Sequence, residues 1–225
     1  MLYFYQRTII NNKNINVHLS INIHSMQKNI LLEPFLNENE LEAGIDEAGR
    51  GCLAGAVFAA AVILPKNFHL AGLNDSKQLS VLKRNMLRYE IEKNALAFAV
   101  ASASVEEIDA LNISNANYLA MHRALLQLKL PPTHLLIDGK FFVSKTNIPY
   151  TCIIKGDSKF ASIAAASILA KTYRDEYITK LSAEFPEYQW HINKGYGTLT
   201  HRKAMAEFGL SEHHRKTFKL KKEIF

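Results

Sequence analysis

Three short β-like runs, each followed closely by an acidic residue, constrain the fold of this chain most strongly. Each run has only four or five residues, a length that suits a buried strand and is too short for a buried helix. The acids and the runs before them are Asp46 and Glu47 after 41–45, Asp138 after 134–137, and Asp157 after 150–154. We therefore expect strands that deliver four carboxylates near their ends, where the carboxylates can meet.

The remaining elements follow from hydrophobic periodicity. Further strands are expected at 56–64 and 96–104, and helices at 80–95, 105–111, 115–128 and 161–181. Ser80 has the side chain of an N-cap residue, and one or two basic helices are expected after Pro186. Strands interleaved with helices predict the α/β class, with a mixed sheet flanked by helices and a C-terminal helical part.

Composition divides the chain into three parts. Residues 1–40 form an N-terminal extension that we expect to be partly disordered, because its first 25 residues have scattered asparagines and no clear period. Residues 41–190 carry the strands and the acids, and this length is enough to bury a full hydrophobic core. Residues 191–225 form a basic helical segment that we expect to pack on that core.

The charge of the chain favours a polyanionic partner. The net charge is +6, and basic residues outnumber acidic ones from residue 199 onward. The basic residues of this segment are Arg202, Lys203, Arg215, Lys216, Lys219, Lys221 and Lys222. Such a concentration of positive charge is typical of proteins that bind nucleic acids.

The two cysteines and the hydropathy pattern exclude other classes. Cys52 and Cys152 have no CxxC spacing, so a thiolate-rich metal site is excluded and a reducing compartment is favoured. No apolar run approaches the roughly 18 residues of a membrane-spanning helix. We therefore expect a cytoplasmic protein that is not inserted in a membrane.

Clustered carboxylates indicate a divalent metal. Mg²⁺ prefers a shell of oxygens, and two such ions can activate water and stabilise the leaving oxygen in an attack on phosphate. Four neighbouring carboxylates repel one another, and a bound cation relieves that repulsion. The cluster therefore predicts metal-dependent phosphodiester hydrolysis.

Each acid also has a purely structural interpretation. Neighbouring residues on a strand face opposite sides, so Asp46 and Glu47 face one site only if the strand ends or bulges there, or if Glu47 contributes its carbonyl oxygen. Asp138 precedes Gly139 and fits a turn, and Asp157 fits a helix cap. The sequence alone leaves these alternatives open.

An ordered set of motifs resembles the type 2 ribonucleases H, the ribonuclease HII family. The motifs are GIDEAGRG at 44–51, DSKQL at 75–79, IDG at 137–139, KGD at 155–157 followed by SIAAASILAK at 162–171, GYGT at 195–198 with His201, and His214-Arg215 with Phe218. The resemblance extends from about residue 42 to 218 and implies a ribonuclease H-like fold. It implies an endoribonuclease that cleaves RNA in RNA–DNA hybrids and incises 5′ to single ribonucleotides in duplex DNA, as in ribonucleotide excision repair.

The resemblance also implies roles for individual residues. Asp46, Glu47, Asp138 and Asp157 are the implied catalytic acids, and the first three are the implied ligands of Mn²⁺ or Mg²⁺. The implied products carry a 3′-hydroxyl and a 5′-phosphate. The implied substrate-binding residues are Gly49, Arg50 and Gly51 as the sensor of the ribonucleotide, Tyr196 against the sugar, and Lys77 near the scissile phosphate.

Three positions depart from the family pattern. Cys52 and Ala56 stand where prolines are common, and Lys140 stands where asparagine is common. The first two affect the stiffness of the loop, and a lysine at position 140 can pair with a carboxylate or a phosphate. We expect these changes to alter metal affinity or pH optimum rather than the reaction.

Two other functions compete with this interpretation. A ribonuclease HIII is disfavoured because 40 residues before the acid loop are too few for its N-terminal domain. A non-catalytic binding module gains nothing from four acids that face a polyanion. A metal-free mechanism with a histidine pair is also disfavoured, because no histidine forms an evident pair with a lysine in a motif. We therefore expect a monomeric nuclease whose partners are RNA–DNA hybrids and ribonucleotide-containing DNA duplexes.

Overall fold

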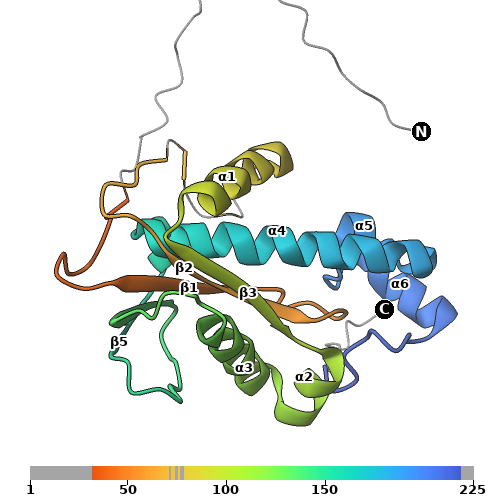
Figure 1. The fold of residues 1–225 in the computed structure, drawn as a ribbon. Coiled ribbons are helices and arrows are strands. Elements are labelled where there is room, and N and C mark those ends of the chain that lie inside the picture. Colours follow the sequence, from red (N-terminus) through yellow and green to blue (C-terminus); the bar gives the residue numbers. More distant parts are fainter. Residues whose placement is uncertain (1–31, 71, 74–75, 77–78, 219–225) are drawn as a thin grey trace, which may run out of the picture.

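A five-stranded mixed sheet forms the centre of the computed structural model (Figure 1). The structure describes residues 32–218 except 71, 74–75 and 77–78. The strands are β1 (Glu42–Ala48), β2 (Val57–Ile63), β3 (Ala97–Ala103), β4 (His134–Asp138) and β5 (Tyr150–Ile153), in the order β3-β2-β1-β4-β5. The first three strands pair antiparallel, and β1, β4 and β5 pair parallel. This confirms the mixed α/β sheet.

Helices cover both faces of the sheet (Figure 1). The helices are α1 (Val81–Asn94), α2 (Val105–Leu111), α3 (Ile113–Leu126), α4 (Ala161–Glu184), α5 (Trp190–Asn193) and α6 (Leu199–Phe208), with 3-10 turns η2 (Gly156–Ser158) and η3 (Pro186–Tyr188). On one face α4 packs against β1 and β2 with α1 beside it. On the other face α3 packs against β2 and β3.

Small side chains let α4 lie unusually close to β1. A methyl group on Gly44 would lie 2.2 Å from the backbone carbonyl carbon of Ser162, which is less than any real contact between such atoms. The first ten residues of α4 are all buried, and alanines at 164–166 contact the sheet where larger side chains would push the helix away. This close contact fixes α4, and the loops that depend on it, relative to the strand that carries Asp46.

A second, smaller apolar cluster joins the C-terminal helices to the far end of α4. Trp190 is fully buried and packs with Ile178, Tyr188 and Ala204. Through this cluster α5 and α6 pack against α4. Among the described residues, no helix is both long enough and apolar enough to cross a membrane.

The structure extends two of the predicted strands through three of the four acids. β1 does not stop before the acids, because Asp46 pairs with Ala60 and Glu47 with Ala59 in the ladder with β2. Likewise β4 includes Asp138, which pairs with Ile153. The expected N-cap of α1 is confirmed, since Ser80 accepts a hydrogen bond from the backbone of Lys83.

Part of the predicted N-terminal extension is hydrogen-bonded to the segment that begins α4. Within the described part of the extension, Glu33 forms an isolated bridge with Phe160 just before α4. Its backbone N–H donates to the Lys159 carbonyl at 2.7 Å, and the Ala161 N–H donates to its carbonyl at 2.9 Å. The prediction of partial disorder covers residues 1–40, of which residues 1–31 lie outside the described residues.

Candidate active site

Asp46 lies at the centre of the candidate site, on β1. Its side chain is only 4% exposed, and its Oδ1 accepts a hydrogen bond from the backbone N–H of Glu47 at 2.7 Å. The Ser167 hydroxyl of α4 also hydrogen-bonds to this carboxylate. Burial raises the pKa of Asp46 well above its ordinary range, and the negative charges of Glu47 and Asp138 raise it further. A cation at this position would relieve all three effects.

The parallel pairing of β1 and β4 explains why Asp46 and Asp138 are neighbours. Ile45 pairs with Ile137, so the next residue on each strand is an aspartate at the same edge of the sheet. Parallel strands place their carboxyl ends together, so this pairing brings the two acids to one edge of the sheet. The electrostatic influence of Asp138 on Asp46 agrees with this arrangement.

Asp157 lies on the turn η2, beside the residue that holds Asp138. The backbone N–H of Gly156 donates to Oδ1 of Asp138 at 2.7 Å, and Asp157 itself is buried. The N-cap residue of α4 is Phe160 and it makes no side-chain cap hydrogen bond. The alternative that Asp157 caps this helix is therefore wrong.

The carboxylates suit a divalent cation chemically, and each has its own protein partner. In the described ranges no group of three or more His, Cys, Asp or Glu side chains is arranged so that it could hold an ion. Asp138 is turned to Gly156, Asp46 to Glu47 and Ser167, and Glu47 has an oxygen 3.8 Å from the Arg50 guanidinium. All three supply the oxygen ligands that Mg²⁺ and Mn²⁺ prefer. The ligand set Asp46, Glu47 and Asp138 stays a prediction.

The loop Gly49-Arg50-Gly51 follows β1 directly. Gly49 has a φ of +92°, and a side chain there would meet the Arg174 guanidinium at 2.1 Å. Both the conformation and the contact therefore require glycine. The Arg50 side chain is 54% exposed, and a methyl group on Gly51 would meet no atom within 4 Å. The outer side of this loop is open to a ligand.

A second loop, which carries Tyr196, lies against the first. The backbone N–H of Leu53 donates to the Gly195 carbonyl at 2.8 Å, and the Cys52 thiol contacts the Lys194 carbonyl at 3.6 Å. The Tyr196 ring is 40% exposed, with Lys171 Nζ 5.8 Å from its centroid. The two predicted substrate-binding loops are thus brought together although 142 residues separate Cys52 from Lys194.

The sequence also singles out two lysines, Lys77 and Lys140. Lys77 lies outside the described residues, although its neighbour Ser76 is described and its hydroxyl lies 2.9 Å from that of Ser167. Lys140 is exposed, and its Nζ lies 5.2 Å from the centroid of the Phe141 ring. In the described part of the chain Lys140 forms no ion pair with the acids.

Sequence reasoning missed two buried arginines that hold the loops. Arg174, fully buried on α4, donates to the carbonyls of Lys194 at 2.7 Å and Ala54 at 3.2 Å. Arg215 is 3% exposed and contacts the loop after β1 through its whole guanidinium. In the sequence Arg215 counts among the basic residues that favour a polyanionic partner, and its burial removes it from the surface. The one sequence feature that set Arg215 apart was its place in the His214-Arg215 motif. A count of basic residues does not show whether such an arginine is buried.

A buried histidine pair is structural. The His201 Nδ1 is 2.9 Å from the Tyr196 carbonyl, so it carries the proton, and its Nε2 accepts the Trp190 indole N–H at 3.0 Å. His214 Nε2 lies 3.1 Å from the same nitrogen. Both rings are almost completely buried, so they fix the Tyr196 loop and do not form an accessible acid–base pair.

Comparisons with known proteins identify the family. The family model described as Ribonuclease HII matches residues 43–221. The Ribonuclease HII of Bacteroides fragilis strain ATCC 25285 is 61% identical over 190 residues, which are 84% of this chain and 94% of that protein. That of Parabacteroides distasonis is 58% identical over 190 residues, 84% of this chain and 96% of that protein.

A solved structure agrees with this assignment. The RNase HII in the PCNA:RNase HII complex from Archaeoglobus fulgidus has a TM-score of 0.68 and 26% identity, over 82% of this chain and 98% of that chain. The alternatives of a ribonuclease HIII and of a non-catalytic binding module are therefore wrong. The chain belongs to the ribonuclease HII family and is a ribonuclease H endonuclease.

Proposed function

We propose that this ribonuclease, besides cleaving the RNA of RNA–DNA hybrids, incises duplex DNA on the 5′ side of a single embedded ribonucleotide. The products would carry a 3′-hydroxyl and a 5′-phosphate. The observation that supports this most is the position of the buried Asp46. It is influenced by Glu47 and Asp138 and lies three residues before the loop Gly49-Arg50-Gly51, of which Arg50 and Gly51 are exposed. Carboxylates and a sugar-recognition loop thus adjoin one another.

Asp46, Glu47 and Asp138 are the residues that would hold Mn²⁺ or Mg²⁺, and Asp157 would join them when substrate is bound. A divalent cation held there would polarise the scissile phosphate and activate the attacking water. The protein contributes orientation, because the Gly156 N–H and the Ser167 hydroxyl fix the directions of the Asp138 and Asp46 carboxylates. The ribose 2′-hydroxyl would serve recognition and would not act as the nucleophile.

Recognition of the ribose is assigned to two loops. Glycines at 49 and 51 let backbone groups approach a sugar closely, and the 2′-hydroxyl distinguishes RNA from DNA at a given position. The exposed Arg50 side chain would contact sugar or phosphate, and the Tyr196 ring would pack against the sugar at the RNA-to-DNA junction. Lys77 would lie near the scissile phosphate.

We further propose that the enzyme is a monomer in the cytoplasm, not bound to a membrane. Both cysteines are free in the structure, which agrees with a reducing compartment. The Archaeoglobus fulgidus relative was solved in a complex with PCNA.

The decisive experiment offers the purified protein three labelled duplexes of one sequence: all DNA, DNA with one ribonucleotide, and an RNA–DNA hybrid. Each is incubated with Mn²⁺, with Mg²⁺ or with a chelator, and the cut is mapped at nucleotide resolution. We expect one metal-dependent cut 5′ to the ribonucleotide and none in all-DNA duplex. A cut elsewhere, or cleavage confined to the hybrid, would refute the proposal.

A further inference from the structure

The Arg215 guanidinium contacts the first substrate loop only through backbone carbonyls. Its Nη2 donates to Gly49 at 2.7 Å and to Gly55 at 2.8 Å, its Nη1 to Arg50 at 2.9 Å, and its Nε to Gly55 at 3.0 Å. Burial lowers its pKa to about 10, so it stays charged at neutral pH. A buried cation that is satisfied by carbonyls orients those carbonyls strongly, since charged donors form the stronger hydrogen bonds.

The orientation of these carbonyls determines where the N–H groups of the loop point. In a planar trans peptide unit the C=O and the following N–H point in opposite directions, and the described residues include no cis peptide. The Gly49 and Arg50 carbonyls point inward to Arg215. The N–H groups of Arg50 and Gly51 therefore point away from Arg215, and in the described residues they have no backbone acceptor.

We propose that Arg215 is a positioning residue for ribose recognition: by binding the Gly49 and Arg50 carbonyls, it aims the N–H groups of Arg50 and Gly51 at the sugar–phosphate backbone of the substrate. This inference rests on the proposed role of the 49–51 loop. Only arginine serves here, because its planar fork presents several donors at fixed angles, whereas a lysine ammonium is a single point of contact.

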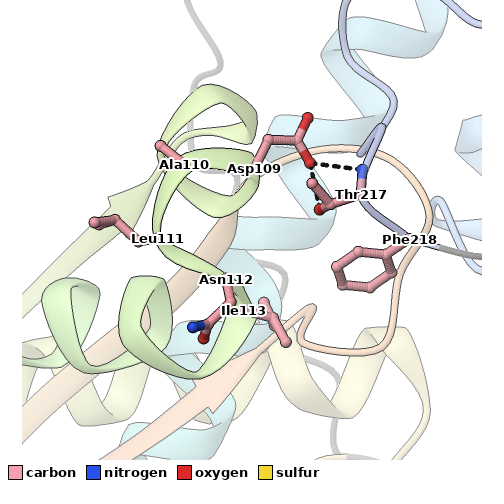
Figure 2. Close-up of a pocket in the computed structure, with 7 residues that line it drawn as sticks. All are labelled: Asp109, Ala110, Leu111, Asn112, Ile113, Thr217 and Phe218. Atoms are coloured by element: carbon pink, nitrogen blue, oxygen red, sulfur yellow. Dashed lines mark hydrogen bonds between the residues drawn. The ribbon is translucent and has the colours of Figure 1, made fainter.

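Asp109 on α2 tethers the segment that carries Arg215. Its carboxylate accepts the backbone N–H groups of Lys216 and Thr217, both at 3.0 Å, and the Thr217 hydroxyl at 2.7 Å. Figure 2 shows Asp109 and Thr217 beside a pocket of about 360 Å³ that Ile113 and Phe218 also line. The Phe218 ring lies 5.0 Å from the Arg215 guanidinium. The backbone next to Arg215 is thus fixed by Asp109, in addition to the hydrogen bonds that its guanidinium makes with the loop.

The test measures discrimination rather than activity alone. Binding of the Arg215→Lys variant to all-DNA duplex and to the same duplex with one ribonucleotide is compared with that of the wild type, and kcat and KM are measured on the second duplex. We expect the preference for the ribonucleotide to fall about tenfold, the effect of one misaligned hydrogen bond, with most of the change in KM. Arg123→Lys is the control, because Arg123 also donates to a backbone carbonyl, that of Ser102, far from this loop in sequence.

A purely structural role would give a different result. Partial unfolding of Arg215→Lys would lower binding to both duplexes alike and leave their ratio unchanged, which would overturn the inference. If the wild type itself shows no preference for the ribonucleotide, the proposed function fails before Arg215 is tested.

A second, milder variant keeps the inference testable if Arg215→Lys does not fold. Asp109→Ala removes the tether and leaves Arg215 in place, and we expect a smaller loss of the same preference, about threefold. Glu106→Ala is its charge-matched control on the same helix, because the Glu106 carboxylate accepts a hydrogen bond from the Ser104 hydroxyl and, among the described residues, none from the 215–217 segment that Asp109 tethers. Equal preferences in Asp109→Ala and Glu106→Ala would overturn the inference.

Discussion

The backbone N–H of Gly156 donates a 2.7 Å hydrogen bond to Oδ1 of Asp138. This contact joins two of the predicted acids indirectly, because Gly156 immediately precedes Asp157 on the turn η2. The direction of the Asp138 carboxylate is thus fixed by the segment that carries the next acid. A change at Asp138 that keeps an acceptor for Gly156 should therefore spare the fold while it alters the chemistry.

Asp138→Asn is expected to remove most turnover while the protein remains folded. The asparagine oxygen can still accept the Gly156 N–H, but the charge that a divalent cation needs is lost. We expect kcat on an RNA–DNA hybrid to fall at least about 100-fold, since the charge stabilisation at stake is several kcal/mol. Thermal unfolding and hybrid affinity should stay near wild type. Glu184→Gln, at the exposed end of α4, is the control, and near-normal cleavage by Asp138→Asn would contradict the site.

Mn²⁺ should stabilise the wild-type protein in the absence of any substrate. A ligand that binds only the folded state at 100 times its Kd adds about 2.7 kcal/mol to the free energy of unfolding. We expect a clear rise in Tm with Mn²⁺, reversed by chelator, and a much smaller rise for Asp138→Asn. Identical Tm shifts in the two proteins would mean that the ion binds elsewhere.

Arg50→Ala should reduce selectivity for a lone ribonucleotide without loss of stability. Its side chain is largely exposed, and its ion pair with Glu47 is long, at 3.8 Å. Such an exposed ion pair contributes little to the free energy of unfolding. We expect kcat/KM on the single-ribonucleotide duplex to fall about tenfold, the usual cost of one charged hydrogen bond. Lys93→Ala, at an exposed position of α1, should behave as wild type. Unchanged incision by Arg50→Ala would show that this side chain does not contact the substrate.

Gly44→Ala is expected to destabilise the protein strongly. The added methyl group would lie 2.2 Å from the Ser162 carbonyl carbon and 2.4 Å from the Ile163 nitrogen. Backbone atoms cannot rotate away, so α4 must move from β1, and we expect a loss of about 3 kcal/mol or more. Urea unfolding measures it. Gly51→Ala adds the same methyl group where no atom lies within 4 Å, and equal stabilities of the two variants would refute the close contact.

The stability of the protein should fall as the pH drops from about 6.5 to about 4. Burial, and then the neighbouring His201, lower the pKa of His214 from 6.5 to about 4, and burial also lowers the pKa of His201. At these two histidines the unfolded chain therefore binds more protons than the folded one across this range, so their protonation favours unfolding, whereas the raised pKa of Asp46 acts in the opposite direction.

The pH effect is measured by urea unfolding at several pH values. We expect His214 to account for roughly 1 to 3 kcal/mol of the loss between the two ends of the range. In His214→Asn, which cannot take up a proton there, the slope should be shallower, even if the variant is less stable at neutral pH. The same slope in both proteins would assign the acid sensitivity to other groups.

Local patterns were enough to predict the scaffold and the meeting of Asp46 with Asp138. Short apolar runs define strands by length, and the parallel pairing of Ile45 with Ile137 brings the following acids to one edge. The boundary of β1 was less accurate, because the predicted strand ended at Ile45, whereas pairing with Ala59 and Ala60 carries it through the acids.

The roles of Arg174 and Arg215 could not be predicted from the sequence. An arginine in a basic segment usually stays hydrated, and its burial depends on carbonyls that only the folded backbone assembles. The carbonyls that bind Arg215 come from Gly49, Arg50 and Gly55, as many as 166 residues away. No local window contains both partners, so this contact became visible only in three dimensions.

The 166-residue separation between Arg215 and Gly49 also bears on synthesis. A ribosome completes all four acids by residue 157, well before it adds the arginine that shapes the loop beside them. On the proposed role of Arg215, a partly made chain would present its acids before the 49–51 loop is set, and selectivity for the ribonucleotide would be the last property that the nascent protein acquires.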